Sequence, residues 1–144
     1  MKSLKNLLTG FVLPVIVTAA LFVGISIVKD GMYLLGVPAV GEVQRVTVAY
    51  PALTPDVRET TDPDQIELAV KLTGFLKYAI FADPDPDDSP LITITYFTAD
   101  GETTVSASRR TVWWNGRALP LRDEDTFVNL TEGIFFYDLV APEE

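Results

Sequence analysis

An uncharged apolar run near the N-terminus constrains this chain more than any other feature. Residues Leu7 to Val28 contain no charged side chain. At about 1.5 Å per residue, a helix of this length extends for roughly 33 Å, enough to cross the hydrocarbon core of a bilayer. Pro14 and Gly24 do not argue against this, because membrane helices tolerate both residue types. We predict a transmembrane helix over residues 7–28, preceded by a cytoplasmic segment at residues 1–6.

Two alternatives to a retained anchor stay open. A cleaved signal peptide has an apolar region of about 7–15 residues before a small-x-small cleavage site. Here the run is longer, and the charged pair Lys29-Asp30 separates it from the nearest candidate, Val-Pro-Ala at residues 37–39. A helix buried in a soluble core is the second alternative, but it should carry a polar face. A lipoprotein anchor is excluded because the chain has no cysteine.

Charge on either side of the run predicts the orientation of the anchor. Lys2 and Lys5 precede the run, and short positively charged flanks stay in the cytoplasm. Three of the 11 Lys and Arg residues lie before Asp30, which leaves eight to balance the 20 Asp and Glu residues from Asp30 onward. We expect a cytoplasmic N-terminus and an acidic extracytoplasmic domain at the cell membrane.

The remaining sequence divides into a connector, one domain and a short tail. Residues 29–41 contain Gly and Pro and are predicted to connect the helix to the domain. Within them, residues 32–35 are expected at the outer face of the membrane, with Tyr33 as an interfacial aromatic. About a hundred residues follow, enough for one domain with a single core, assigned to residues 42–140. Residues 141–144 are predicted to be a frayed tail.

The absence of histidine and cysteine excludes several functional classes. Without histidine there is no Ser-His-Asp triad, no histidine-bound metal and no histidine pH switch. Without cysteine there are no disulfides and no Cys-His pair. The acidic balance argues against a nucleic-acid partner, whose phosphates require Lys and Arg. GxGxxG, P-loop and GxSxG patterns are absent from the sequence, and we expect a protein that is not an enzyme.

The first element expected in the domain is a strand over residues 42–50. Its apolar side chains alternate at Val46, Val48 and Tyr50, which is the pattern of a half-buried strand. Residues 51–61 then have the composition of a loop, and we predict no regular structure there.

A helix over residues 63–81 is the next prediction. Asp62 supplies an N-cap, and Pro63 occupies the first helical position. Glu67 and Lys71 form a favourable i,i+4 pair on the exposed side. The apolar residues that recur at helical spacing are Ile66, Ala69, Val70, Leu72, Leu76, Ala79 and Ile80.

Four further strands and a second helix complete the predicted fold. The strands are expected at residues 91–98, 103–108, 111–114 and 117–121. Asp100-Gly101 predicts a turn, and Asn115-Gly116 predicts a type I′ hairpin. A last helix is expected to begin near Asp123–Asp125, capped by these acids, and to end at about Phe136. The order β-α-β-β-β-β-α predicts an α+β fold, an antiparallel sheet of about five strands with two helices on one face.

An acidic loop over residues 83–90 suggests a calcium site. Carboxylates at alternate positions suit a hard cation, and the candidate ligands are Asp83, Asp85, Asp87 and Asp88. The spacing is not that of an EF-hand, because the sixth position is Asp88 instead of Gly and the twelfth is Ile94 instead of Glu. A solvated loop is the alternative interpretation.

Trp113 and Trp114 form the other conspicuous pair. Adjacent strand residues point to opposite faces, so one indole can enter the core while the other faces outward. An outward Trp beside Arg109, Arg110 and Arg117 could stack on a sugar or anchor a peptide. The alternatives are a Trp that lies flat on the sheet, and an arginine pair that balances nearby acids in a turn.

Three segments of the chain resemble a known family. They are QIELAVKLTGFLKYAIF, LITITYFTADGETTVSASRRTVWWNGRALPL and FVNLTEGIFF. Their order, the VWW strand and the closing helix are similar to an uncharacterised family of small membrane-anchored extracytoplasmic proteins from clostridia-like Gram-positive bacteria. The resemblance covers roughly residues 42–137. It implies an anchored, exported architecture and supplies no catalytic residues.

These observations favour a single-pass membrane protein whose extracytoplasmic domain is a non-catalytic binding module at the cell envelope. Its partner is expected to be a protein or an envelope ligand. Calcium-dependent sensing or stabilisation through Asp83–Asp88 is one alternative, and no other cofactor is expected. An envelope hydrolase that uses carboxylates is a second alternative, although 20 acidic residues do not single out a catalytic pair.

Overall fold

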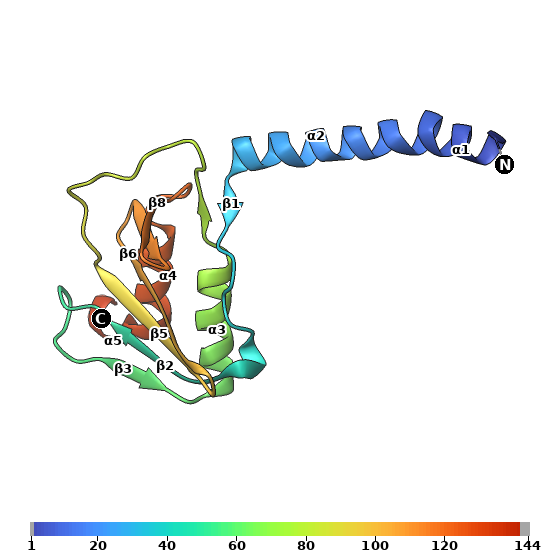
Figure 1. Cartoon of the computed structure of the whole chain (residues 1–144). Coiled ribbons are helices and arrows are strands. Elements are labelled where there is room, and N and C mark those ends of the chain that lie inside the picture. Colours follow the sequence, from blue (N-terminus) through green and yellow to red (C-terminus); the bar gives the residue numbers. More distant parts are fainter. Residues whose placement is uncertain (1, 142–144) are drawn as a thin grey trace.

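The computed structural model describes residues 2–141 of the chain. It shows a long N-terminal helix that projects from a two-layer α+β domain (Figure 1). The predicted fold class is therefore confirmed, whereas the number and order of strands differ from the prediction. Apart from its first residue, the tail predicted at residues 141–144 lies outside the described residues.

The N-terminal helix covers the predicted transmembrane segment and extends beyond both of its ends. It consists of α1 (Lys2–Leu7), the π-helical turn η1 (Leu8–Val12) and α2 (Leu13–Asp30). Within it, the 28 residues Ser3–Asp30 are long and apolar enough to cross a membrane, and their most apolar part is not buried by the rest of the chain. A membrane anchor and an N-terminal signal sequence both fit this description.

A six-stranded antiparallel sheet forms one layer of the domain. Its strand order is β3-β2-β5-β6-β7-β8. The strands are β2 (Val43–Ala49), β3 (Arg58–Thr60), β5 (Ile92–Thr98), β6 (Gly101–Ala107), β7 (Thr111–Trp114) and β8 (Arg117–Pro120). A separate two-stranded sheet pairs β1 (Met32–Tyr33) with β4 (Lys77–Tyr78).

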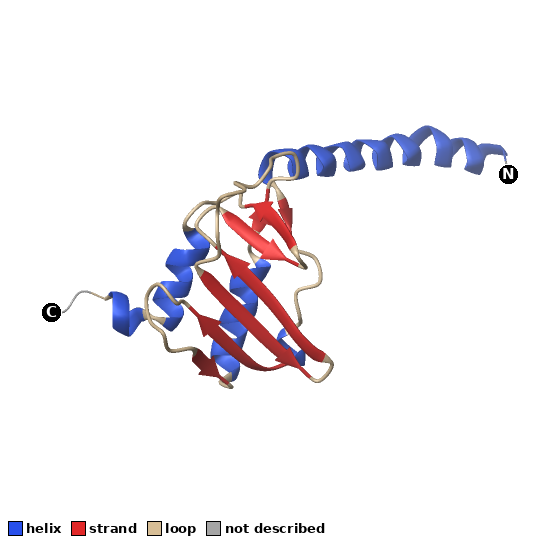
Figure 2. Cartoon of the chain, turned by 60° about the vertical axis from the view of Figure 1, so that its left-hand side comes forward, coloured by secondary structure: helices blue, strands red, loops and turns tan. Residues whose placement is uncertain are grey.

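Two helices form the second layer. Helices α3 (Pro63–Gly74) and α4 (Thr126–Phe135) lie on one face of the sheet, and Figure 2 shows the other face without a covering helix. Two short elements, η2 (Val40–Glu42) and α5 (Tyr137–Val140), complete the description. The largest fully buried side chains between the layers are Val46, Val48, Ile92, Ile94, Tyr96, Val105, Val112, Phe127, Val128 and Phe136.

Tyr96 joins the two layers through its phenol group. The side chain is fully buried, and its hydroxyl donates to the carbonyl oxygen of Ala69 at 2.5 Å. The Thr73 hydroxyl lies 2.5 Å from the Tyr96 hydroxyl oxygen and can donate to it. Burial raises the pKa of Tyr96 far above its usual value, although the hydrogen bond with Thr73 works in the opposite direction. The phenol therefore stays neutral and holds α3 against β5.

The helix predicted over residues 63–81 is correct at its start and wrong at its end. The Asp62 carboxylate accepts a hydrogen bond from the Asp64 amide at 2.9 Å, as an N-cap does, and Glu67 pairs with Lys71 at 2.5 Å. The helix ends at Gly74, however, and the next residues form β4. Apolar spacing alone could not reveal this, because the partner of β4 is β1, which lies more than 40 residues earlier in the sequence.

Two other short strands were not predicted. β3 lies in the segment expected to be a loop, and β1 lies in the segment expected to be a connector. Leu34, which follows β1, is buried in the domain core, so the expectation of a membrane-interface position is wrong for that residue. Neither strand has enough residues to show the period-2 alternation that identifies a strand from sequence.

The closing hairpin and helix follow their local sequence signals more closely. Asn115 and Gly116 both adopt positive φ angles, 49° and 73°, as a type I′ turn requires. Helix α4 lies within the predicted range. The prediction that acidic side chains cap this helix is wrong. Asp125, at the N-cap position, has a left-handed backbone conformation, and its side chain makes no capping hydrogen bond.

Replacing Tyr96 with Phe should destabilise the domain without changing its shape. The substitution leaves the Thr73 hydroxyl and the Ala69 carbonyl without their buried partner, which should lower the free energy of unfolding by about 1–3 kcal/mol. Urea unfolding of the full-length protein in detergent micelles, followed by tryptophan fluorescence, measures this. Tyr33→Phe is the control, because Tyr33 is exposed. Equal losses in both variants would contradict the role given to Tyr96.

Candidate functional site

The two tryptophans lie on opposite faces of the sheet. Trp114 belongs to the buried face, where it is only 6% exposed, and its indole Nε1 donates to the carbonyl oxygen of Leu35 at 2.9 Å. Trp113 is half-buried on the open face, with Ser106 and Ala118 as its cross-strand neighbours. The period-2 geometry of a strand produces this division, as expected from the sequence.

The three arginines expected beside the tryptophans lie in different places. Arg109, in the β6–β7 turn, pairs with Asp125 at 3.1 Å, and this hydrogen bond raises the pKa of its guanidinium. Arg110 pairs with Asp85 of the acidic loop at 3.2 Å. Arg117 lies opposite Trp114 in the β7–β8 hairpin, at the other end of β7. The structure therefore does not unite the predicted arginine and tryptophan residues in one surface.

Sequence reasoning missed a polar cluster that joins three distant segments. The Tyr50 hydroxyl donates to Glu132 Oε1 at 3.0 Å, and the Glu132 carboxylate lies 4.0 Å from Arg109. The Tyr50 ring also packs edge-on against Phe136, with ring centroids 5.8 Å apart. Burial and the nearby Glu132 carboxylate raise the pKa of Tyr50. Because the members of the cluster bind one another, its evident role is to hold α4 against the sheet.

Two carboxylates of the acidic loop, those of Asp85 and Asp88, bind other parts of the protein. Asp85 accepts a hydrogen bond from the Asp87 amide at 2.9 Å in addition to its ion pair with Arg110. Asp88 accepts hydrogen bonds from the Ser108 hydroxyl and, at 2.9 Å, from the Ser89 amide. These contacts fasten the loop to the β6–β7 turn. Within residues 2–141, no group of three or more Asp or Glu side chains is placed to hold a metal ion. Calcium at Asp83–Asp88 stays a prediction that this arrangement does not favour.

The pKa of Asp88 is lowered by its surroundings. Burial alone would raise the pKa, because it disfavours the charged form. The hydrogen bond from Ser108 and the nearby charge of Arg110 outweigh this effect and stabilise the carboxylate. Asp88 therefore contributes most to folding stability when it is ionised in both the folded and the unfolded chain.

Trp114 and Arg117 do meet, at the side of the domain nearest to α2. They line a hollow of about 240 Å³. Its other lining residues are Leu34, Leu35, Tyr78, Asn115 and Leu119. Leu34 and Leu35 are among the first residues after the N-terminal helix, so this hollow lies beside the junction between the helix and the domain.

The junction itself is an ordered part of the domain. Gly31 has a φ angle of 87°, and a Cβ atom at this position would lie 2.8 Å from the Tyr78 carbonyl oxygen, so only glycine fits. The next two residues form β1, and Leu34 is only 7% exposed. The hydrogen bond from Trp114 to Leu35 then fixes the backbone. The chain passes from helix to domain core within four residues.

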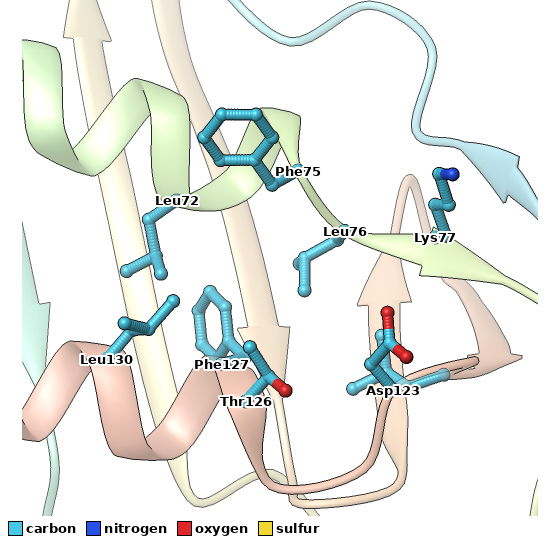
Figure 3. Close-up of a pocket in the computed structure, with 9 residues that line it drawn as sticks. Leu72, Phe75, Leu76, Lys77, Asp123, Thr126, Phe127 and Leu130 are labelled. Carbon is cyan, nitrogen blue, oxygen red and sulfur yellow. The ribbon is translucent and has the colours of Figure 1, made fainter.

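A second apolar hollow lies between α3 and α4 (Figure 3). Leu72 and Phe127 face each other across it, and Lys77 and Asp123 lie at one end. It encloses only about 30 Å³, which is roughly the volume that one molecule occupies in liquid water. This hollow is a seam between two packed helices and is too small for an organic ligand.

Comparison with known proteins gives no match. No protein-family model, no curated protein and no solved structure is similar to the chain. The resemblance to membrane-anchored proteins of clostridia-like bacteria therefore stays a prediction, and function has to be argued from the geometry.

Replacing Asp88 with Asn should destabilise the protein at neutral pH. The folded pKa of Asp88 is lower than its unfolded value, so its contribution is fully present well above pH 4 and disappears as the pH falls through the folded pKa. We expect a loss of about 1 kcal/mol at pH 7, and the difference between wild type and variant should close as the pH falls through the folded pKa of Asp88. Asp87→Asn is the control. A difference that does not depend on pH would contradict this account.

Proposed function

We propose that this chain is a single-pass membrane protein whose α+β domain is a non-catalytic binding module on the outer side of the cytoplasmic membrane. The observation that carries the proposal is the ordered junction between the apolar helix Ser3–Asp30 and the domain core. The proposal has three parts: a retained anchor, its orientation and a binding surface.

The junction supports retention of the anchor. Cleavage at residues 37–39, the nearest small-x-small site, would remove β1 and take Leu34 out of the core. It would also remove the Leu35 carbonyl that accepts the hydrogen bond from Trp114. A signal sequence is normally separable from the domain that it exports, whereas here the residues after the helix belong to the fold.

Charge supports the orientation. The cytoplasmic flank predicted by the sequence carries Lys2 and Lys5, while the domain beyond α2 is strongly acidic. Short flanks rich in Lys and Arg stay in the cytoplasm, and acidic residues have little influence on insertion. The N-terminus is therefore assigned to the cytoplasm and the domain to the outside.

The open face of the sheet is the surface best suited to a partner. Among the described residues, helices cover the opposite face and not this one (Figure 2). Along the central strands the open face presents Thr and Ser side chains on the strands that lead to Trp113. These residues are Thr47, Thr93, Thr95, Thr104 and Ser106. Thr93 and Ser106 share a hydrogen bond of 2.9 Å, so their hydroxyl groups are ordered.

An indole beside an ordered row of hydroxyl groups can stack on a flat partner while the hydroxyls form hydrogen bonds to it. A sugar of the envelope or a peptide segment of another protein has both a flat surface that can stack and polar groups that can form hydrogen bonds. The surface proposed from the sequence is thus reduced to Trp113, because Arg109 and Arg110 are engaged in ion pairs elsewhere. A catalytic role has no comparable support, since the polar cluster around Tyr50 is paired internally.

A photoreactive residue in place of Thr95, on the open face, should capture the partner when the full-length protein is irradiated in living cells. Adding Trp113→Ala should abolish capture, because a buried Trp anchor commonly contributes a large part of the binding energy of an interface. Val57→Ala is the control, because Val57 is exposed in the loop before β3. Capture that survives Trp113→Ala would contradict the proposed surface, and capture of cytoplasmic proteins would contradict the orientation.

A further inference from the structure

The length of the helix places its C-terminal end at a membrane surface. The 28 residues Ser3–Asp30 extend for about 42 Å, and a bilayer with its headgroups is about 40–45 Å thick. If the helix crosses the membrane, Asp30 lies among the headgroups. The position of the domain relative to the lipid then depends on how much chain separates it from Asp30.

No spacer separates the domain from that end. Met32 already pairs with Tyr78, and Tyr33 pairs with Lys77. Three residues reach at most about 11 Å, so Tyr33 lies within that distance of Asp30, and its partner strand lies about 5 Å from Tyr33. The edge of the domain formed by β1 and β4 is therefore held at the level of the headgroups.

A hollow of about 310 Å³ opens between this edge and the helix. On the helix side it is lined by Val23, Ser26, Ile27 and Asp30, and on the domain side by Gly31, Met32, Tyr33, Leu35 and Lys77. Val23 lies about 10 Å below Asp30 along the axis, so the hollow extends from the acyl chains into the headgroup layer. Its apolar end suits acyl chains and Lys77 suits a phosphate, whereas the Asp30 carboxylate, which also lines the hollow, accepts a hydrogen bond from Ser26 at 3.1 Å.

Lys77 is placed to meet a phosphate group. Its ammonium nitrogen lies 4.8 Å from the centre of the Tyr33 ring, which holds the side chain along the rim of the hollow. Arg122 is close, because its amide donates to the Lys77 carbonyl at 2.8 Å, and Arg117 lines the neighbouring hollow beside Leu35. Three of the eight basic residues beyond Asp30 thus gather at this side of an otherwise acidic domain.

Exposed apolar side chains surround the same side. Tyr33 and Leu35 are exposed, and Phe81, three residues after β4, is 82% exposed. The segment that follows β4 begins beside the end of α2, where the Tyr78 carbonyl lies against Gly31 (Figure 1). Tyr is enriched where a protein meets the headgroups. Several exposed apolar side chains on one side of a domain indicate an interaction site.

We propose that this side of the domain rests on the phospholipid headgroups of the membrane that α2 crosses, with Lys77 against a lipid phosphate and Phe81 among the upper acyl chains. The proposal rests on the anchoring proposed above. It assigns the domain a fixed orientation, in which β1, β4 and residues 79–81 face the lipid.

The natural chain has no cysteine, so a single substitution gives a unique site for a spin label. Phe81→Cys, in the full-length protein reconstituted into vesicles of mixed phosphatidylcholine and phosphatidylglycerol, should react more with lipid-soluble oxygen than with an aqueous nickel chelate. Val57→Cys marks the water-exposed end of the domain, and Leu21→Cys marks the lipid-exposed helix. Together these labels test the membrane anchor separately from the docking of the domain on the lipid.

If Leu21→Cys is shielded from nickel while Phe81→Cys behaves like Val57→Cys, the anchor stands and the docking proposal is overturned. If nickel reaches Leu21→Cys freely, the anchoring itself is overturned. Within the Phe81→Cys background, Lys77→Glu should shift the docking equilibrium about fivefold or more towards the undocked form, whereas Lys77→Arg should preserve docking. Equal nickel accessibility in both variants would overturn the contact between Lys77 and phosphate.

Discussion

The hydrogen bond from the Trp114 indole to the Leu35 carbonyl ties the N-terminal helix to the folded domain. It acts together with the burial of Leu34 and the tight passage at Gly31, where any side chain would collide with the Tyr78 carbonyl. A buried indole that lost this acceptor would leave its N–H group unsatisfied, at a cost of about 1–3 kcal/mol. The junction is therefore as much a part of the core as the strands are, and the proposals on anchoring and docking both depend on it.

The two faces of the sheet differ in what they contact. One face carries the core, where Tyr96 binds α3 and the cluster of Tyr50, Glu132 and Arg109 binds α4. Within residues 2–141 no helix lies on the other face, where Trp113 is surrounded by hydroxyl groups and is proposed to contact a partner. Trp114 lies on the first face, where it binds the junction after the N-terminal helix, and Trp113 lies on the second face. Two adjacent residues therefore contribute to different parts of the domain.

Local signals in the sequence predicted the elements that local interactions stabilise. The Asp62 cap, the Asn115-Gly116 turn and the buried face of β2 each depend on residues close together in the chain, and all were predicted correctly. β1, β3 and β4 could not be predicted, because strands of two or three residues are stable only through a distant partner. The ion pairs of Arg109 and Arg110 could not be predicted either, since their acidic partners are 16 and 25 residues away along the chain.

Backbone relaxation of residues 31–38, measured by NMR in the full-length protein within nanodiscs, tests the central claim that the junction is rigid. A rigid junction should give order parameters of about 0.85 along this segment, equal to those of the central strand β5. Values below about 0.6 would show a flexible linker. Such a linker would contradict the ordered junction on which the retained anchor and the docked posture are based.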